Sequence, residues 1–309
     1  MWVKRIWFLP GLAALALAVA GGVALDAQRP SFRTGVDLVL LNVSVTGPGG
    51  RHVGDLSADD FAVYEDGHPQ DISFFSRADT PLAVSMLIDT SSSMEDRLPL
   101  AQRAAIDFVS KLRPGDTAEV VDFDNRIEVL QPFTSDRHLL EAAILRTRAG
   151  GSTALYNAVY IALKQLQKST PQNGDEVRRE VIVVLSDGED TSSLVTFEEL
   201  LDAVKRSHIA IYTIGLALEP MSAKGSTLTG EFVLRRLALE TGGQLFTAKQ
   251  PGELSNVYGQ IADELATQYV LGYLSTNGRK NGDWRSTSVS VRRPNFQART
   301  RPGYYAPVQ

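Results

Sequence analysis

The sequence has no cysteine among its 309 residues and only four histidines. The chain therefore forms no disulfides, and cysteine-based chemistry of any kind is excluded. The histidines are scattered and lack the spacing of a metal site, so we expect them at the surface; they are His52, His68, His138 and His208.

The sequence also lacks an excess of basic residues and a dinucleotide-binding loop. The 31 Lys and Arg residues face 36 Asp and Glu residues, for a net charge of −5, which argues against nucleic-acid binding. No G-x-G-x-x-G motif follows a strand, and we interpret Gly242-Gly243 as the end of a helix. With 43% hydrophobic and 22% charged residues, the composition is that of a globular protein with one large or two modest domains.

One apolar segment lies near the amino end. Lys4 and Arg5 precede the apolar run 6–20, which ends in the A-x-A-type sequence Ala18-Val19-Ala20. This pattern predicts a signal peptide and linker over residues 1–27, and export to the periplasm or the extracellular space. The alternative is an uncleaved membrane anchor, because the run just reaches spanning length. No second run is long and apolar enough, so we expect no membrane span after leader cleavage.

A cluster of oxygen donors follows a predicted buried strand, Leu82–Ile88. The strand is followed by Asp89, Ser91 and Ser93 in a D-x-S-x-S string. In an extended turn, side chains two residues apart point the same way, so one carboxylate and two hydroxyls converge. Hard oxygen donors suit Mg²⁺ or Mn²⁺. The alternative is that Ser91 or Ser93 only caps the helix that follows.

Two later stretches complete the pattern. The turn 150–153 ends in Thr153 and opens a predicted helix, and the apolar strand Glu180–Leu185 leads to Ser186 and Asp187. With these motifs the chain resembles the von Willebrand factor type A domain and its metal-ion-dependent adhesion site. The resemblance implies that one Mg²⁺ or Mn²⁺ ion is the cofactor and that a protein partner offers an Asp or Glu to it. The implied metal ligands are Asp89, Ser91, Ser93, Thr153 and Asp187.

The segment 80–267 alternates predicted strands and helices. This rhythm predicts an α/β fold with a doubly wound, mostly parallel sheet, the Rossmann-like architecture of the resembled domain. In such a sheet ligands bind outside the carboxyl ends of the strands, where the strand order reverses. Asp89 and Asp187 both follow strand ends, and we expect them at that place. Loops at this edge are expected to shape the binding surface: 92–97, 124–125, 189–195 and 218–230.

The two flanks of this domain are β-rich. Residues 36–78 hold predicted strands and a hairpin, with Gln70–Phe75 as its return strand, and residues 268–309 hold three more strands. Neither flank is long enough for a core of its own, so we expect them to pack together as one small β layer. The segments 36–43, 60–67 and 268–273 also resemble a secreted bacterial family related to the type A domain. The tail arginines are expected on a solvated strand face, and the alternative is a site for an anionic partner; they are Arg292, Arg293, Arg299 and Arg301.

The sequence favours a non-enzymatic binding module that holds a protein partner through the metal. No nucleophile–base arrangement is visible, since cysteine is absent and no histidine lies in the motifs. One alternative is a structural assembly subunit whose metal site is stabilising or vestigial. Another is a metal-assisted hydrolase using Asp89 and Asp187, which is disfavoured because Ser91 stands where such enzymes carry a second aspartate.

Overall fold

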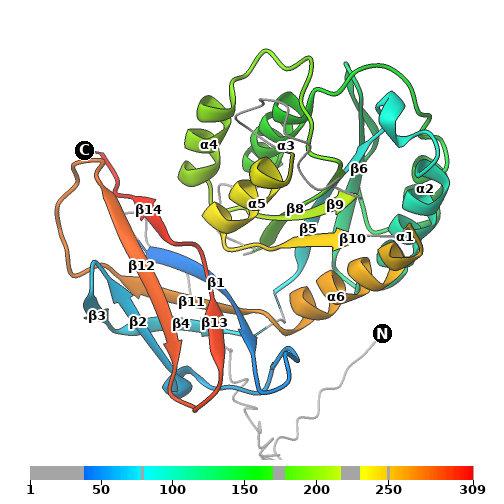
Figure 1. Cartoon of the computed structure of the whole chain (residues 1–309). Helices are drawn as coiled ribbons and strands as arrows, with labels where there is room; N and C mark the ends of the chain where they lie inside the picture. The colour runs from blue at the N-terminus through cyan, green and yellow to red at the C-terminus, as the bar shows by residue number, and fades with distance from the viewer. Residues whose placement is uncertain (1–37, 78–79, 170–177, 217–229, 249–250, 309) are drawn as a thin grey trace, which may run out of the picture. The chain divides into compact units, whose positions relative to one another are not determined.

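A computed structural model describes residues 38–308 except 78–79, 170–177, 217–229 and 249–250. The predicted leader and linker, and nearly all of the loop 218–230, lie outside the described residues. A six-stranded sheet of order β10-β9-β8-β5-β6-β7 forms the centre of the α/β part (Figure 1). Its strands are β5 (Leu82–Asp89), β6 (Thr117–Phe123), β7 (Ile127–Thr134), β8 (Arg179–Ser186), β9 (Ala210–Leu216) and β10 (Leu245–Ala248).

Helices cover both faces of this sheet because its central strands are apolar on both sides. Val84, Met86 and Ile88 of β5 pack into one core with α1, α2 and α6, whereas Ala83 and Leu87 pack into a second core with α3, α4 and α5. The helices are α1 (Leu98–Ser110), α2 (Arg137–Ile144), α3 (Leu155–Ser169), α4 (Phe197–Arg206), α5 (Gly230–Thr241) and α6 (Leu254–Thr267). None of the helices in the described residues is both long and apolar enough to cross a membrane.

The strand order reverses between β5 and β8. The chain leaves β5 toward β6 on one side and later returns to place β8 on the other, and β5 runs parallel to both neighbours. β7 alone is antiparallel, against β6. The fold is therefore the predicted α/β class with a mostly parallel sheet, and its reversal point lies beside the end of β5.

The flanking segments form two four-stranded antiparallel sheets, of order β13-β1-β11-β4 and β14-β12-β2-β3. Strands from the two ends of the chain pair directly, as Leu38 does with Leu274 and Glu65 does with Thr287. Both sheets contribute to one hydrophobic core. The strands are β1 (Leu38–Thr46), β2 (Phe61–Glu65), β3 (His68–Gln70), β4 (Ile72–Ser76), β11 (Tyr269–Leu274), β12 (Trp284–Val291), β13 (Gln297–Arg299) and β14 (Gly303–Tyr305).

This arrangement corrects two expectations for the flanks. We expected one β layer, but the flanks form two sheets, because the apolar side chains of each sheet need a second sheet to cover them. The expected return strand Gln70–Phe75 is in fact two strands. β3 pairs with β2 in one sheet, and β4 pairs with β11 in the other, so the chain changes sheets at Asp71.

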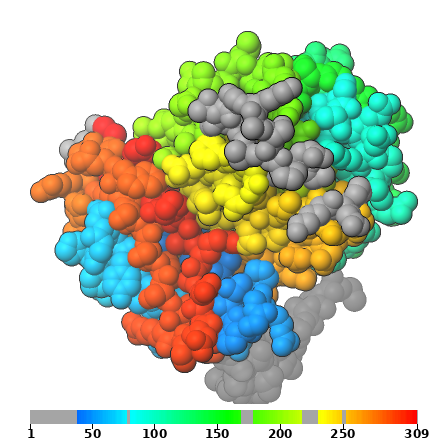
Figure 2. Space-filling model, in the orientation of Figure 1, coloured from blue at the N-terminus to red at the C-terminus, as the bar shows by residue number. Residues whose placement is uncertain are grey.

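The β sheets and the α/β part are joined by buried and partly buried polar contacts. Arg299 donates from Nε to the carbonyl of Gly242, 3.2 Å away, and its Nη2 bonds to Glu264. Arg301 donates from Nη1 to the carbonyl of Ser207, at 3.0 Å. Figure 2 shows the red surface of the last strands directly against the yellow surface of α5. The expected solvated strand face is therefore wrong for Arg299 and Arg301, which bond into the α/β part.

Candidate functional site

The carboxyl ends of β5 and β8 bring two aspartates to one edge of the sheet. Asp89 is the last residue of β5 and its side chain is fully buried. Ile88 pairs with Leu185 in β8, and Asp187 follows the end of β8 by one residue. Asp89 and Asp187 therefore lie at the point where the strand order reverses, as the sequence predicts.

A chain of hydrogen bonds links four of the five predicted ligands. The backbone N–H of Ser91 donates to Asp89 Oδ1 at 2.9 Å, and the hydroxyls of Ser91 and Ser93 lie 3.1 Å apart. The Ser93 hydroxyl donates to Asp187 Oδ2 at 2.7 Å. Oxygen atoms from Asp89 to Asp187 thus form one continuous cluster.

These serines do not serve as helix caps. Ser91 precedes a short 3₁₀ turn, Ser92–Met94, without a side-chain capping bond, and α1 begins later, after Arg97. The alternative interpretation of D-x-S-x-S as a capping motif is therefore wrong. The serine side chains point to the aspartates.

Thr153 reaches the same edge through its loop. The Gly150 N–H donates to the carbonyl of Thr90, and the Ser92 N–H donates to the carbonyl of Gly151, so the turn lies against the residues that follow β5. Thr153 itself is buried, and its N–H donates to Thr191 Oγ1 at 2.9 Å. In the described part of the chain its hydrogen bonds go to Thr191 and Ser192 and not to the other four predicted ligands.

The start of α3 differs from the expected one. The helix begins at Leu155, two residues after Thr153, and Asp190 Oδ1 accepts the N–H of Tyr156 at 3.1 Å. Asp190 also accepts the Ser193 hydroxyl at 2.6 Å. The loop 189–195 therefore caps α3 and holds Thr153 in place, a role that no local signal in the sequence indicates.

Ser186 is a further site residue, which the sequence analysis missed. Its hydroxyl donates to Asp89 Oδ2 at 2.6 Å, and it accepts the N–H of Gly188 at 3.0 Å. The available signal was a lone polar residue at the end of an otherwise apolar strand. Both carboxylate oxygens of Asp89 are therefore hydrogen-bonded.

Burial controls the charge of Asp89. Burial raises the pKa of Asp89 to about 6, hydrogen bonds from Ser186 and Ser91 oppose this rise, and the nearby charge of Asp187 adds to it. Within the described residues no Lys, Arg or His side chain bonds to Asp89 or Asp187. Two carboxylates therefore lie at one edge of the sheet, and no cationic side chain of the described residues pairs with them.

Comparisons with known proteins agree with this geometry. Residues 84–189 match the family model of the von Willebrand factor type A domain. The chain contains a von Willebrand factor type A domain. Domains of this kind often mediate protein–protein interactions, and they are generally not catalytic. The matched segment includes all five predicted ligands.

Bacterial relatives extend the similarity beyond this segment. A UPF0353 protein of Mycolicibacterium paratuberculosis is 28% identical over 223 residues, which cover 67% of this chain and 66% of the relative. A UPF0353 protein of Nocardia farcinica is 27% identical over 231 residues, covering 65% of this chain and 66% of the relative. The chain thus spans slightly less than two thirds of the length of these relatives.

A solved structure shares the fold. The von Willebrand factor type A protein of Catenulispora acidiphila aligns with a TM-score of 0.52 and 14% identity, over 90% of this chain and 75% of that one. At this identity the likeness concerns the fold alone.

The predicted donor set would fit a hard divalent ion. Asp89 and Asp187 would supply two carboxylates, and Ser91, Ser93 and Thr153 would supply neutral hydroxyls. Mg²⁺ prefers oxygen ligands and is commonly bound through one or two carboxylates with water in the remaining positions. The described residues contain no group of three or more His, Asp or Glu side chains that could hold a metal ion, so oxygen donors from Ser and Thr are an essential part of the predicted set.

Proposed function

We propose that this protein is an exported, non-enzymatic binding module that holds a protein partner through a divalent metal ion. The ion, Mg²⁺ or Mn²⁺, would be held by Asp89, Ser91, Ser93, Thr153 and Asp187. One observation carries the proposal. The hydrogen-bonded chain from Asp89 through Ser91 and Ser93 to Asp187 gathers two carboxylates at one strand edge, and no basic side chain of the described residues bonds to them.

Each ligand would have a distinct part in this function. The two carboxylates balance the charge of the ion, and the serine and threonine hydroxyls add neutral oxygens, so the bound ion would retain the capacity to attract an outside carboxylate. Ser186 holds the buried Asp89 in its orientation through its 2.6 Å bond. The partner would therefore offer an Asp or Glu side chain.

The rival functions have less support. A hydrolase would need an additional carboxylate or base at the ion, but Ser91 and Ser93 supply hydroxyls at the positions after Asp89 and bond to the aspartates. A structural assembly subunit with a stabilising metal remains the second candidate. It differs in one measurable property, because its partner binding would survive removal of the metal.

Export is proposed from the predicted leader over residues 1–27. The basic start, the apolar run and the A-x-A-type sequence support it. Secretion can be checked by cell fractionation of the full chain beside a chain in which Leu15 is replaced by Arg. We expect this variant to stay in the cytoplasm.

The metal site is tested by thermal melts in EDTA, Mg²⁺ and Mn²⁺. A ligand that binds the folded state adds about 2.7 kcal/mol of stability at 100 times its Kd. We expect the parent to melt at a higher temperature with metal, and Asp187→Asn to show no rise. Asp71→Asn, which changes an exposed aspartate of the β sheets, is the matched control and should behave like the parent.

Two outcomes would count against this proposal. A metal-dependent rise that persists in Asp187→Asn would place the ion elsewhere. A parent whose affinity for its protein partner is the same in EDTA as in Mg²⁺ would favour the structural subunit.

A further inference from the structure

A pocket of about 440 Å³ lies among the β sheets and the end of α4, apart from the metal site. It is lined by β1 at Leu38, by the segment after β11, by β12 and β14, and by His208 of the α/β part. A volume of this size is in the range of small-molecule sites. The pocket therefore has room for a ligand of about the size of a substituted benzene or a sugar.

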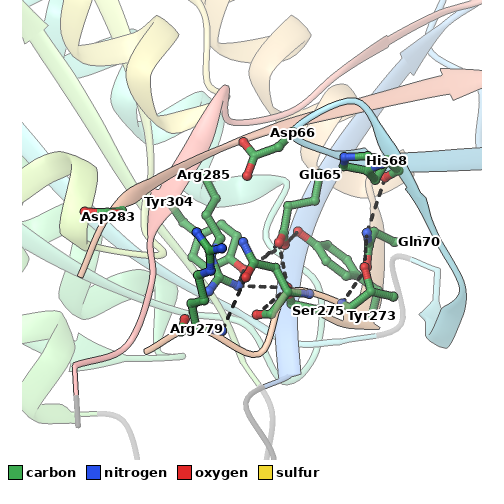
Figure 3. A network of polar contacts seen from close by, with 12 residues as sticks. Glu65, Asp66, His68, Gln70, Tyr273, Ser275, Arg279, Asp283, Arg285 and Tyr304 are labelled. Atoms are coloured by element: carbon green, nitrogen blue, oxygen red, sulfur yellow. Dashed lines mark hydrogen bonds and ion pairs between the residues drawn. The ribbon is translucent and has the colours of Figure 1, made fainter. Parts of the chain in front are cut away.

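The lining carries positive charge. Among the described residues that line the pocket, four are basic and none is Asp or Glu; the four are Arg279, Lys280, Arg285 and Arg301. Glu65, behind the wall, neutralises one of them, because its carboxylate lies 3.3 Å from Arg285 Nη1. Figure 3 shows this pair, with the hydroxyls of Ser275 and Tyr304 around it.

In the part of the chain that the structure describes, Arg301 has no such acid partner. Its side chain is 6% exposed, and its Nη1 donates to the carbonyl of Ser207 and to Nδ1 of His208, at 3.0 and 2.9 Å. Its Nε and Nη2 are buried and have no hydrogen-bond partner among the described residues. Burial lowers the pKa of Arg301 to about 10, so the guanidinium still carries its charge at neutral pH. A buried cation with two unsatisfied N–H groups is costly, and an oxyanion would satisfy it.

The rest of the pocket is apolar. Leu38, Leu274 and Pro307 contribute aliphatic surface, and Tyr304 and Tyr305 contribute aromatic rings. Leu274 is 46% exposed, so part of this surface faces water when the pocket holds no ligand. A ligand with an apolar body would cover that surface, whereas an inorganic ion would not.

We propose that this pocket binds a small organic anion, with its carboxylate or phosphate group at Arg301 and its apolar body against Leu38, Leu274 and Tyr304. The site is independent of the metal site, because its lining residues include none of the metal ligands. Arg285, whose charge Glu65 balances, shapes the pocket, and the exposed Arg279 adds positive potential at its margin.

The test is isothermal titration calorimetry of the full chain in EDTA at constant ionic strength. Phenyl phosphate and benzoate are the anionic probes, inorganic phosphate tests the contribution of the apolar body, and benzyl alcohol is the neutral probe. We expect saturable binding of at least one aromatic anion, weaker binding of inorganic phosphate, and none of benzyl alcohol. Because a hydrogen bond to a charged group is involved, Arg301→Gln should weaken binding at least about tenfold.

Two further variants keep the test decisive. Arg279→Gln changes an exposed residue of the pocket margin, so it tests the site if Arg301→Gln does not fold, and it should weaken binding a few-fold. Arg103→Gln removes an exposed arginine on α1, outside the pocket, and should leave binding unchanged.

Absence of saturable binding by both aromatic anions would overturn the proposal. Equal losses in Arg279→Gln and Arg103→Gln would overturn it as well, because they would indicate attraction by overall charge. Since EDTA is present throughout, neither result depends on the metal site.

Discussion

The Tyr212 hydroxyl donates a 2.6 Å hydrogen bond to Glu264 Oε1, joining β9 to α6 beneath the β sheets. The same oxygen accepts the hydroxyl of Ser44 on β1 at 2.6 Å and bonds to Arg299 on β13. Glu264 is fully buried, and His52 Nε2 lies 3.8 Å from its other oxygen. One carboxylate therefore connects the type A domain with both ends of the chain.

Replacing this carboxylate should destabilise the fold. Glu264→Gln removes the charge that faces Arg299, and loss of one partner of a buried pair typically costs 3–5 kcal/mol. Because Arg299 is 28% exposed, we expect a smaller loss of unfolding free energy, about 2–3 kcal/mol. Denaturant unfolding in EDTA measures it.

The matched control is Glu231→Gln, which breaks an exposed pair with Arg235 within α5. Exposed pairs contribute less than about 1 kcal/mol. If the two variants lost similar stability, the junction at Glu264 would not hold the β sheets to the type A domain.

Metal-free stability should depend on the ionisation of Asp89. Its pKa is about 6 when folded and 3.8 in its ordinary state, so the folded chain retains the proton over a pH range in which the unfolded chain releases it. The contribution of Asp89 to the unfolding free energy is complete below about pH 3.8 and is lost as the pH rises through about 6. The difference between the two pKa values corresponds to roughly 3 kcal/mol of unfolding free energy.

The measurement compares the parent with Asp89→Asn in EDTA between about pH 4 and pH 7. We expect the parent to lose up to roughly 3 kcal/mol relative to Asp89→Asn as the pH rises, because the variant cannot ionise. Asp71→Asn should follow the parent at every pH. If the unfolding free energies of the parent and of Asp89→Asn differed by the same amount at every pH, the buried carboxylate would not titrate in this range.

Gly188 should not tolerate a side chain. Its φ of +81° lies in the left-handed region, and an added Cβ would come 2.4 Å from the carbonyl oxygen of Gly230. We expect Gly188→Ala to lower the unfolding free energy by about 1–3 kcal/mol, and to weaken metal binding, since the Gly188 N–H donates to Ser186 beside Asp89. Gly278→Ala is the control, because an added Cβ there has no atom within 4 Å. A tolerated Gly188→Ala would mean that the loop relaxes without cost.

Local patterns predicted much of this structure. The apolar run before Asp89 predicted β5, and the alternation of strands and helices over 80–267 predicted the α/β class with a mostly parallel sheet. Contacts between distant residues could not be predicted this way. Ser186 joins the site because β8 lies beside β5, and Arg299 bonds to the buried Glu264, 35 residues away in the sequence. The switch of the chain between sheets at Asp71 also depends on β11, which lies about 200 residues later.

The strand partners of β1 are synthesised late, so the sheet that contains β1 forms late in folding. In the described residues the sheet neighbours of β1 are β11 and β13, which the ribosome makes more than 200 residues later, whereas every strand of the central sheet lies within Leu82–Ala248. The type A domain can therefore fold while β1 still has two open edges, and such edges invite pairing with other chains. Contacts between the two ends of a chain also form slowly. Synthesis of β11 and β13 is thus the step that ends the exposure of both edges of β1.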